Sequence, residues 1–250
     1  MQDIKINDQN PHCSKHVLPA VPLSEVYLED CVTALKRFND NHFDLAIVDP
    51  PYGLGIDGQK GDVKKGVQIR KAHSFKGWDN AIPTAEYFTE LKRVSKNQII
   101  WGGNYFTEFL QPTKAWIFWY KGQQDLTMSD GEMAWTSMDK VTRMVNIHRT
   151  HIWQEKPMHP TQKPVKLYDW LLHNYAQPND LILDTHAGSM SSVIACLKGG
   201  FNITAFEIDK EYFEKGKKRF ETFLSQGNLF MEKQQINFID TCSNETKKFR

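Results

Sequence analysis

Residues 49–52 read Asp-Pro-Pro-Tyr and directly follow the apolar residues 46–48, which are typical of the end of a buried strand. At a strand end, the carboxylate of Asp49 can accept a hydrogen bond from an amine. Pro50 and Pro51 have no N–H and fix the course of the backbone, so carbonyl acceptors dominate there. Tyr52 adds a flat face for a planar ring. The four residues favour a pocket for an aromatic ring that bears an amino group, although Asp before Pro-Pro is also common in rigid turns.

A second group of candidate residues lies in LILDTHAGSMSS, residues 181–192. Asp184 ends a predicted strand and is followed by a short turn with Gly188 and by a helix N-terminus, which is where ligands bind in open α/β sheets. Glu207 ends the next predicted strand, at a spacing typical of a carboxylate that binds ribose hydroxyls. The single glycine favours a ligand without phosphate. An ordinary turn with Ser189 as the helix N-cap explains the stretch equally well.

Strand and helix patterns alternate around these two groups of residues. Strands are predicted at residues 24–30, 43–49, 98–103, 114–121, 181–184 and 202–207, and helices at residues 31–38, 82–96, 163–176, 189–198 and 210–224. This alternation predicts an α/β fold with a doubly wound, mostly parallel, Rossmann-like sheet and helices on both faces. The polar residues 1–20, 55–80 and 121–157 and the tail after residue 225 are expected to be loops, inserts or frayed ends.

Composition narrows the class of protein. The 250 residues are 40% hydrophobic, which is enough for one large α/β domain or two small ones. The formal net charge is +1, so binding to nucleic acid would depend on local clusters of Lys and Arg. The four cysteines are widely spaced, and neither a metal site nor a disulfide framework is predicted. No signal peptide and no apolar stretch of membrane-spanning length is recognisable, so we expect a cytoplasmic protein without membrane contact.

Four segments, taken in their order along the chain, resemble a known family. YLEDC at 27–31 precedes DPPY at 49–52, and HPTQKPVKLYDWLL at 159–172 and LILDTHAGS at 181–189 follow far downstream. This set resembles the DNA amino-methyltransferases that use S-adenosylmethionine, in the permuted motif order of the β class. The resemblance covers about residues 25–220. It implies a methyltransferase fold, S-adenosylmethionine as the cofactor and double-stranded DNA as the partner.

The resemblance implies a role for each matched residue. Asp49 and the carbonyl of Pro50 would hold the target amine, while Tyr52 stacks on a base that has left the duplex. Pro51 completes the catalytic motif. The implied cofactor-binding residues are Asp30 and Cys31 near the adenine, Glu207 on the ribose, His159, Thr161 and Lys163 near the methionine part, and Asp184, Thr185, His186, Gly188 and Ser189 around the turn.

Two features depart from the family pattern. Met190 stands where a second glycine is usual, and Thr185 and His186 replace the more usual Pro or Phe pair. These departures bear on the local path of the chain near the cofactor. They leave Asp184 and Gly188 in place.

Two groups of basic residues are candidate contacts with DNA. The first follows the catalytic motif, and the second lies where the family places its target-recognition region; a solvated charged surface is the alternative for both. The candidates are Lys60, Lys64, Lys65, Arg70, Lys71, Lys76, Lys140, Arg143 and Arg149.

These observations predict an organisation and a function. We expect an N-terminal extension (1–24), a catalytic half (25–120), a target-recognition insert (121–157), a cofactor-binding half (158–225) and a C-terminal tail (226–250). The predicted activity is site-specific methylation of N6 of a flipped-out adenine in DNA, because Asp rather than Ser heads the motif. The alternatives are methylation of N4 of cytosine, of RNA or of a protein amide, and a catalytically silent DNA-binding subunit. The family also suggests a homodimer, whereas a restriction partner cannot be named from the sequence.

Overall fold

The computed structural model describes residues 24–56, 62–64, 67–70, 76–77, 79–124, 129–155, 157–159, 161–226, 236–241 and 245–249. The strands are β1 (Ser24–Leu28), β2 (Phe43–Val48), β3 (Asp62–Lys64), β4 (Val67–Arg70), β5 (Ser95–Trp101), β6 (Trp116–Tyr120), β7 (Gly131–Thr136), β8 (Arg143–Asn146), β9 (Leu181–Asp184), β10 (Asn202–Glu207), β11 (Ile236–Asp240) and β12 (Glu245–Phe249). The helices are α1 (Cys31–Leu35), α2 (Ala85–Val94), α3 (Thr150–Gln154), α4 (Val165–Tyr175), α5 (Ser191–Gly199) and α6 (Lys210–Ser225), with a 3-10 turn η1 (Gly103–Tyr105).

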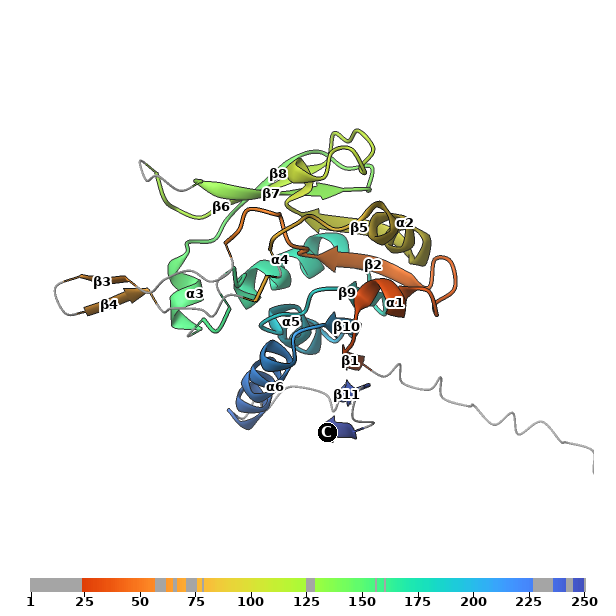
Figure 1. The fold of residues 1–250 in the computed structure, drawn as a ribbon. Coiled ribbons are helices and arrows are strands. Elements are labelled where there is room, and N and C mark those ends of the chain that lie inside the picture. The colour runs from red at the N-terminus through yellow and green to blue at the C-terminus, as the bar shows by residue number, and fades with distance from the viewer. Residues whose placement is uncertain are drawn as a thin grey trace, which may run out of the picture.

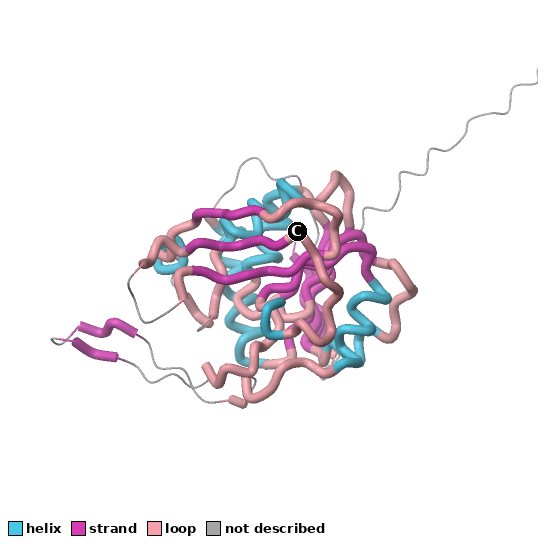
Figure 2. The backbone as a smooth tube through the Cα atoms, turned by 90° about the horizontal axis from the view of Figure 1, so that it is seen from above, coloured by secondary structure: helices cyan, strands magenta, loops and turns pink. Residues whose placement is uncertain are grey.

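Ten strands form one sheet in the order β12-β11-β1-β10-β9-β2-β5-β7-β6-β8. Neighbouring strands are parallel except where β7 meets β5 and β6 and where β12 meets β11. β3 and β4 form a separate antiparallel pair, which Figure 2 shows apart from the large sheet. Together with the helices that cover both faces (Figure 1), this confirms the predicted doubly wound, mostly parallel Rossmann-like sheet.

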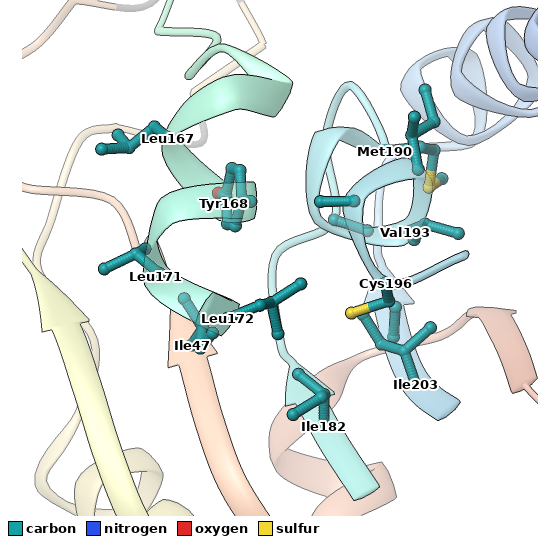
Figure 3. Close-up of a cluster of buried hydrophobic side chains, with 14 of the residues drawn as sticks. Ile47, Leu167, Tyr168, Leu171, Leu172, Ile182, Met190, Val193, Cys196 and Ile203 are labelled. Atoms are coloured by element: carbon teal, nitrogen blue, oxygen red, sulfur yellow. The ribbon is translucent and has the colours of Figure 1, made fainter. Parts of the chain in front are cut away.

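Each face of the sheet buries its own apolar core. Helices α4, α5 and α6 cover the face that presents Ile47, Ile182 and Ile203, as Figure 3 shows. Helices α1 and α2 cover the opposite face, which presents Val48 and Ile100. Adjacent strand residues such as Ile47 and Val48 belong to different cores because side chains alternate across a strand. Burying one such side chain stabilises the fold by about 1.5–3 kcal/mol, so the centre of the sheet is a rigid support for the residues at the strand ends.

Three of the segments expected to be irregular contain strands, so the prediction was wrong for them, whereas residues 1–20 lie outside the described residues. Residues 121–157 hold β7, β8 and α3, residues 55–80 hold β3 and β4, and the tail holds β11 and β12. In the large sheet these are short strands at or near its two ends, and some of their pairings join segments that lie far apart in the sequence. β7 pairs with β5, for example, and β11 pairs with β1. Such pairing depends on the tertiary context more than on local apolar periodicity.

Strand order brings the candidate residues to one edge of the sheet. β2 pairs in parallel with β9, with Ala46 opposite Leu183, and β10 pairs in parallel with β1, with Glu207 opposite Leu28. These strands end at the same edge, where open α/β sheets bind their ligands. β7 runs the other way and therefore begins at this edge, with Glu132 opposite Trp119 of β6. Among the described residues, no helix has the length and apolar character needed to cross a membrane.

Candidate active site

Asp49 follows β2, and its side chain is 15% exposed. Its Oδ1 accepts a hydrogen bond from the hydroxyl of Tyr52 at 2.7 Å and lies 2.5 Å from Nζ of Lys163. Its Oδ2 accepts no hydrogen bond from the part of the chain that the structure describes. One oxygen is therefore held in place by the protein, and the other can accept an N–H from a ligand.

The ring of Tyr52 lies directly against the backbone of Gly102, which follows β5. Gly102 has a φ of +69°, and a Cβ at this position would stand 2.3 Å from Cε1 of Tyr52. Tyr105 of η1 stacks on the Tyr52 ring, with centroids 5.3 Å apart and an interplanar angle of 22°. Tyr105 is itself 41% exposed. The segment WGGNY at 101–105 therefore lines the site and positions Tyr52.

Lys163 is directed toward Asp49. Its ammonium group lies 2.5 Å from Oδ1 of Asp49 and 2.9 Å from Oε2 of Glu132, and its side chain is 2% exposed. Glu132 also forms an ion pair with Lys121, which follows β6. Sequence analysis did not single out Glu132 or Lys121 for this site, because a single acidic residue in a polar segment carries no local signal. We call Asp49, Lys163, Glu132 and Lys121 the acid–lysine cluster.

Burial and mutual charge shift the pKa values in this cluster. Burial raises the pKa of Asp49, and the nearby Glu132 adds to this, so the net shift is upward despite the opposing effect of Lys163. Burial lowers the pKa of Lys163, but the two carboxylates outweigh it, and the net shift is also upward. Burial acts to raise the pKa of Glu132, but the two lysines hold it at about 2. Lys163 is therefore an ammonium and Glu132 a carboxylate at neutral pH.

Asp184 organises the turn that follows β9. Its Oδ1 accepts a hydrogen bond from the backbone N–H of His186 at 2.9 Å, and its Oδ2 accepts one from the hydroxyl of Ser192 at 2.5 Å. Burial raises the pKa of Asp184 to about 6. Burial also lowers the pKa of His186 to about 4, so this imidazole is neutral at pH 7. The hydroxyl of Thr185 lies between Nδ1 of His186 (2.9 Å) and the hydroxyl of Tyr87 (2.8 Å), which fixes the orientation of both rings.

Glu207 is a buried carboxylate at the end of β10. Its Oε2 accepts the N–H of Gly188, and its Oε1 accepts the N–H of Asp209, both at 2.8 Å. Burial raises its pKa to about 7. Among the described residues, no lysine or arginine pairs with it, and each oxygen keeps a lone pair. These two acceptor oxygens fit the two hydroxyl groups of a ribose, which would donate to them, whereas a phosphate would be repelled.

Asp30 and Cys31 lie beside Glu207 because β1 and β10 are neighbours. The N–H of Glu29 donates to the carbonyl of Glu207 at 2.9 Å. Asp30 is the N-cap of α1, and its Oδ2 accepts the N–H of Thr33 at 2.8 Å. Burial raises the pKa of the Cys31 thiol to about 12, so it remains protonated. The two residues therefore lie beside Glu207, just after the carboxyl end of β1.

His159 and Thr161 border the turn from the other side. The His159 ring packs on Tyr212 with centroids 4.4 Å apart, and its Nδ1 lies 3.0 Å from the hydroxyl of Thr161. A Cβ at Gly188 would stand 4.0 Å from Cδ2 of His159. Of the three residues expected near the methionine part of a cofactor, these two lie near the turn, whereas Lys163 is bound to Asp49.

The fold accommodates Met190, the departure from the family pattern. Met190 has a φ of +61° and is fully buried, and it precedes α5 as its N-cap. Its side chain packs on α6 at Gly216, where a Cβ would stand 2.6 Å from Cγ of Met190. Ser189 is therefore not the N-cap; its hydroxyl lies 3.1 Å from that of Ser191. Gly216 of α6 therefore leaves space for the side chain of Met190, which stands where the family usually has a second glycine.

An arginine joins the turn to its surroundings. Arg219 of α6 donates to the carbonyl of Ser189 at 2.5 Å and to Oε2 of Glu155 at 2.7 Å. Oε1 of Glu155 accepts the N–H of Val165, the first residue of α4, at 2.9 Å. The turn, α6 and the start of α4 are thereby held together, which also holds the backbone next to Lys163.

The candidate DNA-binding residues that the structure describes do not gather in one place. Nζ of Lys76 lies 2.7 Å from Asp209 and 2.8 Å from Glu211, which attaches its segment to the start of α6. Arg149 lies after β8, near the edge that holds Asp49, and donates to Gln123 at 2.8 Å. Two others, Lys140 and Arg143, precede or begin β8 and so lie toward the opposite edge. Lys60, Lys65 and Lys71 lie outside the described residues, and Lys64 and Arg70 are the last residues of β3 and β4.

A comparison with family models identifies the chain. The model of a family described as DNA methylase, covering the N6 and N4 enzymes, matches residues 87–218, just over half of the chain. The chain belongs to this DNA methylase family. The predicted resemblance is thereby confirmed. The chain is also 26% identical over 239 residues to the Type II methyltransferase M.HpaI of Haemophilus parainfluenzae, an alignment that covers 77% of this chain and 73% of that protein.

Solved structures share the fold of this DNA methylase. The M1.HpyAVI-SAM complex superposes with a TM-score of 0.54 at 20% identity and covers 79% of this chain and 99% of its own. The cytosine-N4-specific PvuII DNA methyltransferase gives a TM-score of 0.54 at 14% identity and covers 80% of this chain and 87% of its own. Because the second of these is an N4 enzyme by name, the fold does not decide which base is the target.

Proposed function

We propose that this DNA methylase transfers a methyl group from S-adenosylmethionine to N6 of adenine in double-stranded DNA. The observation that carries the proposal is the state of Asp49: Tyr52 and Lys163 hold its Oδ1, while its Oδ2 can accept an amine N–H. Glu207 ends β10 and Asp49 follows β2, and both strands end at the same edge of the sheet. Membership of the DNA methylase family supports DNA as the substrate, and Asp rather than Ser at the head of the motif supports adenine over cytosine.

The residues around the turn suit this cofactor. When bound, S-adenosylmethionine supplies a methyl group on a positively charged sulfonium. Glu207 would accept hydrogen bonds from the ribose hydroxyls, and Asp30 and Cys31 would border the adenine. His159 and Thr161 would border the methionine part. Two buried carboxylates, Asp184 and Glu207, favour a cationic ligand over a phosphate.

The catalytic residues position the amine. Asp49 accepts one N–H through Oδ2, and the carbonyl of Pro50 accepts the other, so the nitrogen lone pair is directed at the methyl donor. The amine proton becomes acidic as the new N–C bond forms, and Asp49 takes it up; the raised pKa of Asp49 makes it a better acceptor. Tyr52 and Tyr105 supply aromatic faces for a base that has left the duplex.

We also propose residues 121–157 as a region that contacts the target. β7 and β8 of this segment belong to the large sheet, and Arg149 lies near the edge that holds Asp49. Arg149 is therefore a better candidate for contact with DNA near the reacting base than Lys140 or Arg143. The division into a catalytic half and a cofactor-binding half, and the homodimer, stay predictions.

The test is incubation with labelled S-adenosylmethionine and mixed-sequence duplex DNA, followed by mass analysis of the nucleosides. N6-methyladenine is the expected product. N4-methylcytosine would keep the mechanism and overturn the choice of base. Absence of any methylated nucleoside despite cofactor binding would overturn the proposal in favour of RNA, a protein amide or a silent DNA-binding role.

Replacing the catalytic carboxylate tests the role of Asp49. Asp49→Ala is expected to abolish methylation and to leave S-adenosylmethionine affinity largely unchanged, because Asp49 contacts the amine. Asp139→Ala is the matched control, since Asp139 is 89% exposed and pairs only with Lys114 among the described residues. An Asp49→Ala protein that still methylates DNA would contradict the mechanism.

A further inference from the structure

The acid–lysine cluster places a second carboxylate on the lysine that holds Asp49. We infer that Glu132 is a positioning residue: it binds Lys163 alongside Asp49 and so keeps Asp49 a competent acceptor for the target amine. The inference rests on the proposed function, which requires Asp49 to accept an N–H and then a proton. It adds a residue from β7 to the reaction, within the segment predicted to recognise the target.

The ammonium group of Lys163 is buried and is surrounded by three acceptors. An ammonium group has three N–H donors. Three acceptors surround Nζ of Lys163: Oδ1 of Asp49 at 2.5 Å, Oε2 of Glu132 at 2.9 Å and the hydroxyl of Tyr52 at 3.2 Å. The rings of Trp101 and Tyr52 lie 5.2 Å and 5.6 Å from Nζ, and the lysine side chain is 2% exposed. If Glu132 lost its charge, the ammonium would be left with Asp49 as its only anionic partner among the residues that the structure describes.

The net charge of the acid–lysine cluster depends on Glu132. With Asp49 and Glu132 ionised and Lys163 and Lys121 protonated, the acid–lysine cluster has no net charge. Without the Glu132 carboxylate it is positive, next to an amine nitrogen that gains positive charge as the methyl group arrives. Fixed charge around a reacting atom is worth more in a buried site than in water. Glu132 therefore offsets Lys163 at the step where Asp49 must attract the amine.

The groups that face Asp49 define its expected titration. The ionisable side chains that interact with it come from its own segment, α2, α4, β7, the end of β9 and the loop that precedes α4. They are Tyr52, Tyr87, Tyr168, Glu132, Asp184 and Lys163. Of these, Glu132 raises the pKa of Asp49 and Lys163 lowers it. Removing the charge of Glu132 should therefore lower the pKa of Asp49, and removing the charge of Lys163 should raise it.

Glu132→Gln keeps the size of the side chain and removes its charge. The single-turnover methylation rate should fall on the order of 10- to 100-fold. The Kd for S-adenosylmethionine, measured by calorimetry, should not change. The acid limb of the pH–rate profile should move to lower pH, because the carboxylate that raised the pKa of Asp49 is gone. Lys163→Met should move the acid limb to higher pH, and Glu132→Asp, which keeps the charge, should recover most of the rate.

A second readout does not depend on turnover. Carboxyl NMR of the protein labelled with 13C at aspartate, without cofactor, should show Asp49 titrating at lower pH in Glu132→Gln than in the wild type. The Asp49 signal is the carboxyl resonance that disappears from the spectrum of the Asp49→Asn variant. Glu214→Gln is the matched control, because Glu214 is exposed on α6 and has the same change of charge. It should keep the wild-type rate, profile and titration.

The outcomes separate this inference from the proposed function. A wild-type protein that forms no methylated nucleoside would overturn the proposed function. A wild-type protein that is active, with a Glu132→Gln variant of equal rate and unchanged Asp49 titration, would overturn the inference alone. A loss of cofactor affinity in Glu132→Gln that accounts for its loss of rate would also overturn it, because Lys163 would then act on the cofactor.

Discussion

Gly102→Ala should disable catalysis while preserving the fold, because Gly102 leaves the space that Tyr52 occupies. A Cβ at Gly102 would stand 2.3, 2.5 and 2.8 Å from Cε1, Cδ1 and Cζ of Tyr52. Carbon atoms in contact are separated by about 3.5–4.0 Å, so the ring must move by about 1 Å. That movement would stretch the 2.7 Å hydrogen bond from Tyr52 to Asp49 and disturb the stack with Tyr105. A misplacement of about 1 Å costs on the order of 100-fold in rate.

A control separates the clash from backbone strain. Gly102 has a φ of +69° and Gly200 a φ of +75°, and both therefore lose about 1–2 kcal/mol of stability when alanine is forced into the left-handed region. A Cβ at Gly200 meets no atom within 4 Å. Gly200→Ala should therefore lower the free energy of unfolding by the backbone strain alone and keep the wild-type rate.

The assays are urea unfolding and single-turnover methylation of duplex DNA at saturating cofactor. We expect both variants to lose stability, and only Gly102→Ala to lose rate, by on the order of 100-fold. If Gly102→Ala methylates as fast as Gly200→Ala, Tyr52 is not positioned by Gly102 for the reaction, and this reasoning is refuted.

Two further predictions concern the cofactor pocket and the turn. The pKa of Glu207 rises from 4.5 to about 7 on folding, so its contribution to stability is complete below pH 4.5 and is lost as the pH rises through 7. Glu207→Gln removes this titration, so the stability of the ligand-free variant relative to the wild type should be higher at pH 8 than at pH 4.5 by about 3 kcal/mol, and equal melting shifts at both pH values would contradict this. Gly216→Ala should destabilise the protein by about 1–3 kcal/mol in urea, since its Cβ would stand 2.6 Å from Met190; the loss should vanish in a Met190→Ala background.

Local patterns in the sequence were sufficient for the centre of the sheet. β2, β9 and β10 are apolar runs that end at or next to candidate residues, and α2, α4 and α6 have apolar side chains at helical spacing. Their periodicity reflects burial on the two faces of a sheet, and it can be read without knowing the partner strands. The position of Asp49 and Glu207 at strand ends was predictable from the same patterns.

The remaining parts of the site depend on contacts between distant segments. Glu132 reaches Lys163 only because β7 is antiparallel and begins at the edge where β2 ends, and Gly102 faces Tyr52 only because β5 pairs with β2. Strand pairing is a property of the assembled sheet, and neither β7 nor its direction has a local signature. The sequence by itself determined the class of fold and the family. Only the tertiary structure decided that Lys163 pairs with Asp49 and that Glu132 pairs with the same lysine, because an ion pair depends on where two segments meet.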